Sequence, residues 1–201
     1  MRLVTIVPTG TANTASVVAA LTRLGAAVEE AASAGDVETS PGVVLPGVGA
    51  FGSAMGRIDT LGLAAAVRVR IEANRPTLAV CVGMQLLSRD SEESPGVTGL
   101  KVLEETVGRF GDGVTVPQMG WNRVEPGSGS RFVEPGWAYF ANSYRIDRTP
   151  KGWVGSSTDH GGEFVSALEK GDVLACQFHP ELSGEWGARL LDRWLQRVEA
   201  A

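Results

Sequence analysis

The stretch Thr-Leu-Ala-Val-Cys-Val-Gly-Met-Gln-Leu-Leu, residues 77–87, changes its pattern at Cys81. Before Cys81 lies a short apolar run, residues 77–80, which predicts a strand. After it, Val-Gly makes a Gly-containing turn, and residues 84–87 begin a helical pattern. The stretch therefore predicts a strand, a sharp turn and a helix, in that order.

The same order recurs upstream of this stretch. Residues 3–7 and 42–45 are further apolar runs, and 26–29 can form an edge strand. Apolar residues at helical spacing occupy 15–24, which Gly25 closes, and 61–71. Repeated alternation of strand and helix favours a parallel sheet with helices on both faces and functional loops at the carboxyl ends of its strands.

Beyond about residue 95 the texture changes. Short apolar runs are separated by Gly and Pro, and they predict later, partly antiparallel strands at 114–116, 137–140, 164–168 and 173–178. Residues 187–198 form an amphipathic closing helix, with an apolar stripe of Leu190, Leu191, Trp194 and Val198. With no internal repeat or linker, residues 1–201 are expected to form a single α/β domain.

Composition limits the class of protein. A chain of 201 residues with 43% hydrophobic and 20% charged residues is typical of one globular domain. A net charge of -5 argues against nucleic acid as a partner. The apolar runs are too short for a secretion signal or a membrane span, and 2 cysteines give no disulfide framework. We expect a cytoplasmic protein.

Cys81 is a candidate nucleophile because of its place between strand and helix. A side chain at such a turn projects from the carboxyl edge of the sheet, in the manner of a nucleophile elbow. The helix that begins behind it favours the thiolate over the thiol. Taken alone, Cys81 is better explained as a buried structural cysteine, and its context has to overturn that interpretation.

His179 and Glu181 are candidates for the base and the group that orients it. They flank Pro180 at the end of the run 173–178, and Pro180 biases His179 toward an extended backbone. A cysteine nucleophile needs a histidine to move protons and a carboxylate to hold the imidazole. The alternative is a strand-end histidine beside a solvated acid. His160 lies in a Gly-rich turn and is expected to face solvent.

A zinc site is the competing interpretation, because Cys176 and His179 are three residues apart and Cys81 could join them. On a strand, residues three apart point to opposite faces, so these two would not converge on one ion. The sequence therefore favours Cys176 as a core residue, and no metal is expected.

Five ordered segments make the chain resemble the class I, or triad, glutamine amidotransferases. The Met-Gly-Trp-Asn and Ser-Glu-Glu-x-Pro-Gly motifs resemble, within that group, the glutaminase subunit of imidazole glycerol phosphate synthase. The segments are 46–52, 81–87, 91–97, 117–122 and 177–181. The resemblance implies a flavodoxin-like fold, hydrolysis of glutamine by Cys81, His179 and Glu181, no cofactor, and transfer of ammonia to a (βα)8-barrel cyclase subunit in a heterodimer.

The resemblance also implies roles for residues outside the triad. Backbone N–H groups of the loop Gly47, Val48 and Gly49, with that of Val82, would form an oxyanion hole; the glycines could also mark an ordinary turn. Four residues would contact glutamine, with the charge of Glu93 suited to its ammonium group: Gln85, Glu93, Ser143 and Tyr144. Gln85 could instead be a surface residue of its helix, and Tyr144 could simply pack.

Positions near the cyclase subunit follow from the same resemblance, namely Asn13, Trp121, Asn122 and Leu182. An exposed Trp121 would suit a binding hot spot, although Trp121 could also pack over a turn. The chain departs from the family's usual pattern at several places. Ala79 replaces a glycine, Gln118 and Asn142 replace histidines, and Leu182 replaces a lysine that pairs with an acid on the cyclase.

Two rivals remain open from the sequence. One is a glutaminase that serves another synthase, of the anthranilate or pyridoxal phosphate type, with the same triad. The Met-Gly-Trp-Asn motif at 119–122 speaks against it. The other is a catalytically silent module that keeps the fold to regulate a synthase, and the intact triad speaks against that.

Overall fold

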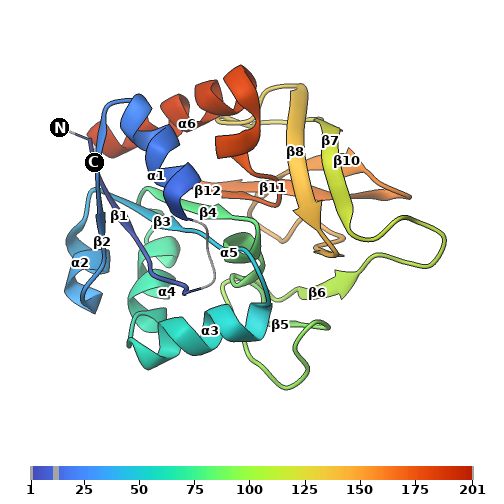
Figure 1. The fold of residues 1–201 in the computed structure, drawn as a ribbon, viewed down its shortest axis with the longest axis horizontal. Coiled ribbons are helices and arrows are strands. Elements are labelled where there is room, and N and C mark those ends of the chain that lie inside the picture. The colour runs from blue at the N-terminus through green and yellow to red at the C-terminus, as the bar shows by residue number, and fades with distance from the viewer. Residues whose placement is uncertain (1, 11–13, 201) are drawn as a thin grey trace.

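Apolar runs from both halves of the sequence meet in one seven-stranded sheet in the computed structural model, which describes residues 2–10 and 14–200 (Figure 1). The strand order is β10-β11-β12-β4-β3-β1-β2. The strands are β1 (Arg2–Ile6), β2 (Ala26–Glu30), β3 (Gly42–Leu45), β4 (Thr77–Val80), β10 (Val154–Asp159), β11 (Glu163–Lys170) and β12 (Val173–Cys176). Neighbours from β12 to β2 are parallel, whereas β10 and β11 are antiparallel. The predicted mostly parallel sheet with later antiparallel strands is confirmed.

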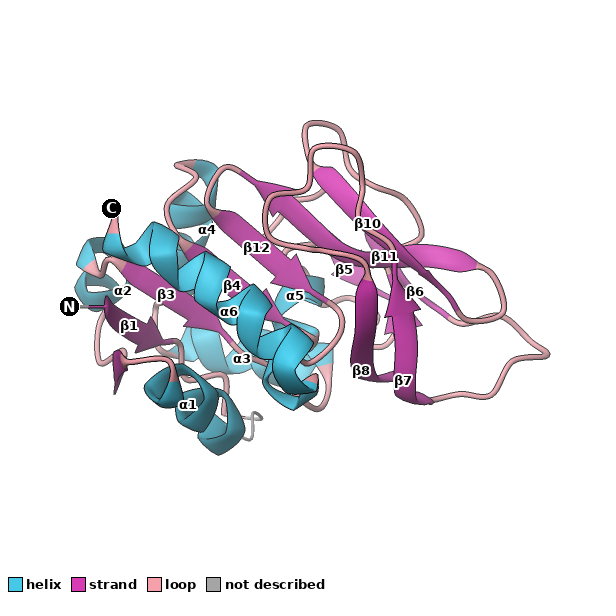
Figure 2. Cartoon of the chain, turned by 90° about the horizontal axis from the view of Figure 1, so that it is seen from above, coloured by secondary structure: helices cyan, strands magenta, loops and turns pink. Residues whose placement is uncertain are grey.

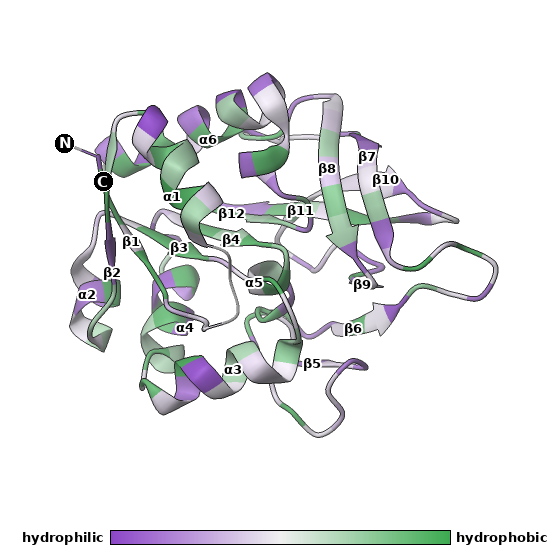
Figure 3. Cartoon of the chain, in the orientation of Figure 1, coloured by the Kyte–Doolittle hydropathy of each residue, from purple (hydrophilic) through white to green (hydrophobic). Residues whose placement is uncertain are grey.

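The burial of each strand's side chains matches its position in the sheet. Every residue of β3, β4 and β12 is buried, as strands covered on both faces require. β2 ends in the partly or fully exposed Glu29 and Glu30 and lies at the edge, as predicted. The hydropathy colouring shows the apolar strands running through the middle of the molecule (Figure 3).

Helices cover both faces of this sheet. Figures 1 and 2 show α1 (Thr14–Arg23) and α6 (Gly184–Glu199) on one face, with α3 (Phe51–Thr60) and α4 (Ala64–Glu72) on the other, where α2 (Ala34–Thr39) packs against α4. The predicted stripe of α6 is buried in full. Among the helices that the structure describes, none combines the length and the apolar character needed to cross a membrane.

A second region stands beyond the carboxyl ends of the parallel strands. The antiparallel pair β7 (Gln118–Val124) and β8 (Gly136–Asn142) rises beside the main sheet (Figure 2). The short strands β5 (Asp90–Ser91), β6 (Thr106–Arg109) and β9 (Tyr144–Arg145) lie below this pair in the view of Figure 3. The pair β7–β8 therefore overhangs the sheet edge where the parallel strands end.

Several predicted elements are wrong in position. Residues 114–116 form no strand; they follow a Gly-Asp-Gly turn, and the Val114 side chain packs against Gly161. The helix predicted at 61–71 begins at Ala64, because Gly62 adopts a positive φ of 69°. The helix after Cys81 is α5 (Val82–Gln85), a single turn. The motif at 119–122 lies within strand β7 and not on a turn.

Candidate active site

Cys81 occupies a strained turn directly after β4. Its backbone has φ 54° and ψ -112°, a conformation that L-residues seldom adopt and that is held here by its surroundings. The turn packs closely against the end of β3 and the loop after it, and both segments need glycine there. A Cβ on Gly83 would lie 2.0 Å from the Leu45 carbonyl oxygen, and a Cβ on Gly47 would lie 2.7 Å from the Gly83 nitrogen. The geometry is that of the predicted nucleophile elbow.

His179 and Glu181 form a buried pair. Nδ1 of His179 lies 2.9 Å from Oε1 of Glu181, and both side chains are 6% exposed. Glu181 belongs to a short 3-10 helix, Pro180–Leu182, and His179 before it has the extended backbone that Pro180 was expected to impose. The second oxygen of Glu181 is buried and accepts no hydrogen bond from the described residues.

The sheet brings this pair to Cys81. β12 is the parallel neighbour of β4, with Cys176 opposite Val80, so the segments that follow both strands leave the same edge. Burial lowers the pKa of His179, but hydrogen bonds and charge interactions with Cys81 and Glu181 raise it more, to a pKa of about 10. At neutral pH the imidazole is therefore a cation beside the Cys81 sulfur.

The zinc alternative finds no support in this arrangement. Cys176 is fully buried, and burial raises the pKa of its thiol well above the ordinary value, with Glu169 and Glu181 acting in the same direction. Within residues 2–10 and 14–200, no group of three or more Cys, His, Asp or Glu side chains could hold a metal ion.

Cys81 and His179 open into a pocket of about 220 Å³. It is lined by Val48, Gly49, Cys81, Val82, Gln85, Glu93, Ala141, Asn142, Ser143, Tyr144 and His179. All four residues predicted to contact glutamine are among these. A more open hollow of about 630 Å³ lies between Arg89, Glu104 and Arg148 and includes none of the predicted site residues.

Gln85 is a buried residue of the pocket and not a surface residue of its helix. Its Nε2 donates to the Tyr144 carbonyl at 3.2 Å and to Oε1 of Gln177 at 3.0 Å. Gln177 in turn places its Nε2 3.7 Å from the Cys81 sulfur. These contacts link two pocket residues, Gln85 and Tyr144, through Gln177 to the nucleophile.

The loop predicted to form an oxyanion hole lies beside Cys81. Val48 and Gly49 line the pocket, and Gly49 has a φ of 92°, which favours glycine. The N–H of Val82 donates to the Gly47 carbonyl at 3.3 Å. In this structure that N–H is therefore engaged by the loop itself.

Other predicted residues are placed less uniformly. Trp121 and Leu182 are exposed, at 55% and 45%. Asn122 follows Trp121 on β7 and points to the opposite face, where its Nδ2 donates to the Asp159 carbonyl at 2.7 Å. Trp121 and Asn122 thus do not share one surface. Asn13 lies outside the described residues.

His160 differs from its prediction. Its side chain packs edge-on against Phe110, with ring centroids 5.1 Å apart, and its Nε2 lies 2.8 Å from the Thr115 carbonyl. The residue is therefore only partly exposed, where a solvent-facing turn residue was predicted. The reason is tertiary packing of the 111–117 segment, which a local turn pattern does not reveal.

Comparison with known proteins places this arrangement in a family. The family model described as glutamine amidotransferase class-I matches residues 9–198. The chain belongs to the class-I glutamine amidotransferases. This confirms the resemblance inferred from the five sequence segments.

Similar class-I amidotransferases carry more specific names. A Moorella thermoacetica protein named imidazole glycerol phosphate synthase subunit HisH is 40% identical, over 100% of this chain and 98% of its own length. A protein of the same name from Symbiobacterium thermophilum is 41% identical, over 98% and 95%. In Arabidopsis thaliana, imidazole glycerol phosphate synthase hisHF, chloroplastic, is 38% identical, and the match covers 96% of this chain and 34% of that protein.

Solved structures share the class-I amidotransferase fold. One described as a glutamine amidotransferase superposes with a TM-score of 0.77 at 23% identity, covering 98% of both chains. The structure of PurLQS from Thermotoga maritima gives a TM-score of 0.72 at 15% identity, over 98% of this chain and 97% of that one. At such identities the likeness shows the fold alone.

Two features of this amidotransferase site were not predicted. Gln177 lies in the segment 177–181 but received no role of its own, although a polar residue inside the apolar run 173–178 is a signal that could have drawn attention to it. Asn142, noted only as a departure from the usual histidine, lines the pocket, and its Nδ2 donates to the Tyr144 carbonyl at 3.1 Å.

Proposed function

We propose that this chain is the glutaminase subunit of an imidazole glycerol phosphate synthase. It hydrolyses glutamine and supplies the ammonia to a (βα)8-barrel cyclase subunit, which makes imidazole glycerol phosphate and aminoimidazole carboxamide ribotide. The main support for glutaminase activity is that Cys81, which has a strained backbone, and His179, which is paired with Glu181, line the same pocket. The names of the full-length relatives support the choice of synthase.

The proposed first step is attack of the Cys81 thiolate on the side-chain amide carbon of glutamine. The His179 imidazolium donates a proton to the departing nitrogen, and ammonia leaves behind a glutamyl thioester. Water then attacks the thioester while His179 takes its proton, and glutamate is released. Glu181 holds the imidazole through Nδ1, which leaves the other ring nitrogen for these transfers.

Negative charge on the amide oxygen needs donors at the loop 47–49 and Val82. Because the Val82 N–H is bonded to the Gly47 carbonyl, it can serve an oxyanion only after that bond opens. The proposal therefore includes a shift of this loop in the reacting enzyme. Glu93 would pair with the ammonium group of glutamine at the far end of the pocket.

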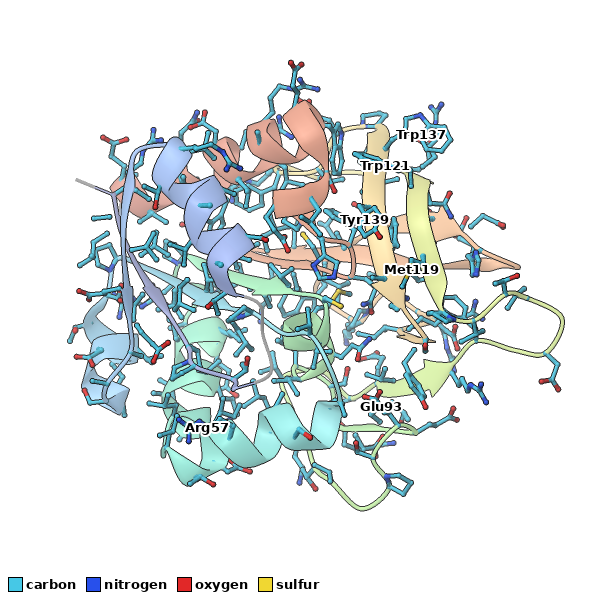
Figure 4. The ribbon with its side chains drawn as sticks, viewed as in Figure 1. Arg57, Glu93, Met119, Trp121, Trp137 and Tyr139 are labelled. Carbon is cyan, nitrogen blue, oxygen red and sulfur yellow. The ribbon has the colours of Figure 1, made fainter. Side chains whose placement is uncertain are left out.

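The proposed cyclase surface is the outward face of β7–β8 with Leu182. Figure 4 shows Met119, Trp121, Trp137 and Tyr139 projecting along this hairpin. Exposed fractions are 69% for Met119, 55% for both tryptophans and 45% for Leu182. So many large apolar side chains exposed together are typical of a surface that binds another protein. Absence of nucleic-acid and membrane partners, and a cytoplasmic location, stay predictions.

The two cysteines offer a matched test of the nucleophile. Cys81→Ala is expected to lower glutamine-dependent synthesis by the assembled enzyme at least about a thousandfold while ammonia-dependent synthesis stays within twofold. Cys176→Ala, which removes a buried thiol outside the pocket, should keep both activities within a few-fold. Unchanged use of glutamine by Cys81→Ala would overturn the proposal, and binding to a different synthase would overturn the choice of partner.

A further inference from the structure

Ser183 occupies the N-cap position of α6, yet its hydroxyl does not cap the helix. A serine at this position ordinarily accepts an N–H from the first helical turn. Here the side chain makes no such bond, and the residue is only 1% exposed. Because this buried hydroxyl does not cap the helix, its hydrogen-bond partners must lie elsewhere.

Those partners are two backbone groups, one at His179 and one at Tyr139 on β8. The Ser183 hydroxyl donates to the His179 carbonyl at 2.6 Å and accepts the Tyr139 N–H at 3.0 Å. Tyr139 also accepts, through its own carbonyl, the His179 N–H at 2.9 Å. Tyr139 and His179 are therefore joined by one direct hydrogen bond and by a second connection through Ser183.

Tyr139 belongs to the exposed hairpin. Its ring lies edge-on to Trp121, with centroids 6.3 Å apart, among the apolar side chains that Figure 4 shows along β7–β8. Trp121 reaches back to the same segment, since its ring lies 3.8 Å from where a Cβ on Gly184 would stand. The hairpin thus touches the segment 179–184 at both of these points.

We propose that Ser183 is a positioning residue that fixes the backbone of His179 to the hairpin, so that the hairpin's position determines where the imidazole meets Cys81. The inference rests on the proposed function, because it concerns the reaction of that same site. Without the hydroxyl, the partly buried Tyr139 N–H loses its acceptor, and His179 keeps only its direct bond to β8. Misplacement of a catalytic group by about 1 Å can lower a rate about a hundredfold.

Ser40 provides a matched control for a purely structural effect. Its hydroxyl is also buried, accepts one bond, from Thr5 Oγ1 at 2.9 Å, and donates one, to the Gly42 carbonyl at 2.8 Å. Neither partner lines the pocket. Ser40→Ala and Ser183→Ala therefore remove the same group with the same number of bonds, and only one of them touches the His179 segment.

The test uses the chain assembled with its cyclase subunit, and measures kcat and KM for glutamine. The pH profile of Cys81 alkylation by iodoacetamide, followed by peptide mass spectrometry on the isolated chain, reports the relation between thiolate and imidazole directly. For Ser183→Ala we expect kcat to fall at least tenfold, KM to change less than twofold, and the alkylation profile to move along the pH axis. Ser40→Ala should leave kcat and KM within twofold of the parent values and the alkylation profile unmoved.

A Ser183→Ala enzyme with kcat within twofold and an unmoved profile would overturn the inference. An equal loss in Ser40→Ala would do the same, because it would reveal a general loss of structure. The unmodified chain distinguishes failure of this inference from failure of the proposed function. If the unmodified chain hydrolyses no glutamine, the proposed function fails. If it hydrolyses glutamine normally and Ser183→Ala has the same kcat and alkylation profile, only the positioning role of Ser183 is removed.

Discussion

One oxygen of the Glu93 carboxylate accepts the Phe51 N–H at 2.7 Å, at the start of α3. The next residue, Ser94, accepts the Gly52 N–H at 3.0 Å. Ala50, the N-cap of α3, has no side chain able to cap, so these two residues supply the cap from another part of the chain. Only Glu93 also lines the pocket, and it therefore has both a structural contact and a predicted contact with substrate.

Replacing Glu93 separates these two contacts. Glu93→Gln keeps an oxygen that can accept the Phe51 N–H but removes the charge expected to meet the substrate ammonium. We expect KM for glutamine to rise at least tenfold, about 1.4 kcal/mol, with a smaller change in kcat. Steady-state glutaminase assays check this.

Ser94→Ala is the control for Glu93, because it removes a cap from the same helix without touching the pocket. Its KM should stay within twofold of the parent value, even if α3 loses about 1 kcal/mol of stability. A Glu93→Gln variant whose KM equals that of Ser94→Ala would remove Glu93 from the substrate site.

At the scale of elements, Arg70 joins the starts of two core strands to the carboxyl end of α2. The side chain is buried on α4, and its guanidinium donates at 2.7–3.0 Å to the carbonyls of Val37, Ser40, Pro41 and Pro76. Burial, with a smaller effect of the Arg75 charge, lowers the pKa of Arg70 to about 10, so it remains a cation at neutral pH. One charged side chain thus satisfies four carbonyls near the amino ends of β3 and β4.

Arg70→Met tests this role. Several buried carbonyls lose a charged donor, so we expect the free energy of unfolding to fall by at least about 3 kcal/mol at pH 7. Arg68→Met is the control on the same helix, since Arg68 is half-exposed and pairs with the similarly exposed Glu72 at 3.5 Å. Its loss should be at most about 0.5 kcal/mol. Urea unfolding measures both, and equal losses would contradict the role of Arg70.

The elements that the sequence predicted well are those whose own pattern determines them. β3 and β4 are short apolar runs buried on both faces, and both were predicted with their observed bounds. α2 was missed although Ser33 and Asp36 form a capping box, a signal that was present. α3 was missed for a physical reason, because its cap comes from Glu93 and Ser94, far along the chain.

The short length of α5 also depends on distant contacts. The Leu86 carbonyl accepts the Leu100 N–H, and the Leu87 carbonyl accepts those of Val102 and Leu103. These bonds turn the chain away from the helix that the apolar pattern of 84–87 predicted. The helix behind Cys81 is therefore a single turn.

The grouping of site residues was predictable where strand ends determine it. Cys81 and His179 follow neighbouring parallel strands, so their proximity follows from topology. Ser183 was not predictable in this way, because its position suggests a helix cap and its actual partner Tyr139 lies 44 residues earlier. Residues that connect the site to the hairpin depend on tertiary contacts, which the local sequence does not encode.

For the whole molecule, the apolar surface on β7–β8 lies against the segment that carries His179 and Glu181. Leu182 is next to Glu181 in the chain and 45% exposed, and Trp121 contacts the segment that follows it. Relatives in the family often carry a lysine at the position of Leu182, and that lysine pairs with an acid on the cyclase. Leucine cannot form that pair, and we propose that the predicted interface with a cyclase uses apolar contact instead, with Trp121 as its main anchor.

Leu182→Lys tests whether this interface has been compensated. A lysine would have to lie among exposed apolar side chains, so we expect cyclase-stimulated glutaminase activity to stay within tenfold of the parent value or to fall. Leu61→Lys is the control, because Leu61 is another exposed leucine, at 38%, at the end of α3 and away from the hairpin. It should leave stimulation unchanged. A rise of tenfold or more in Leu182→Lys, about 1.4 kcal/mol, would mean that the lost ion pair had weakened coupling and that apolar contact had not replaced it.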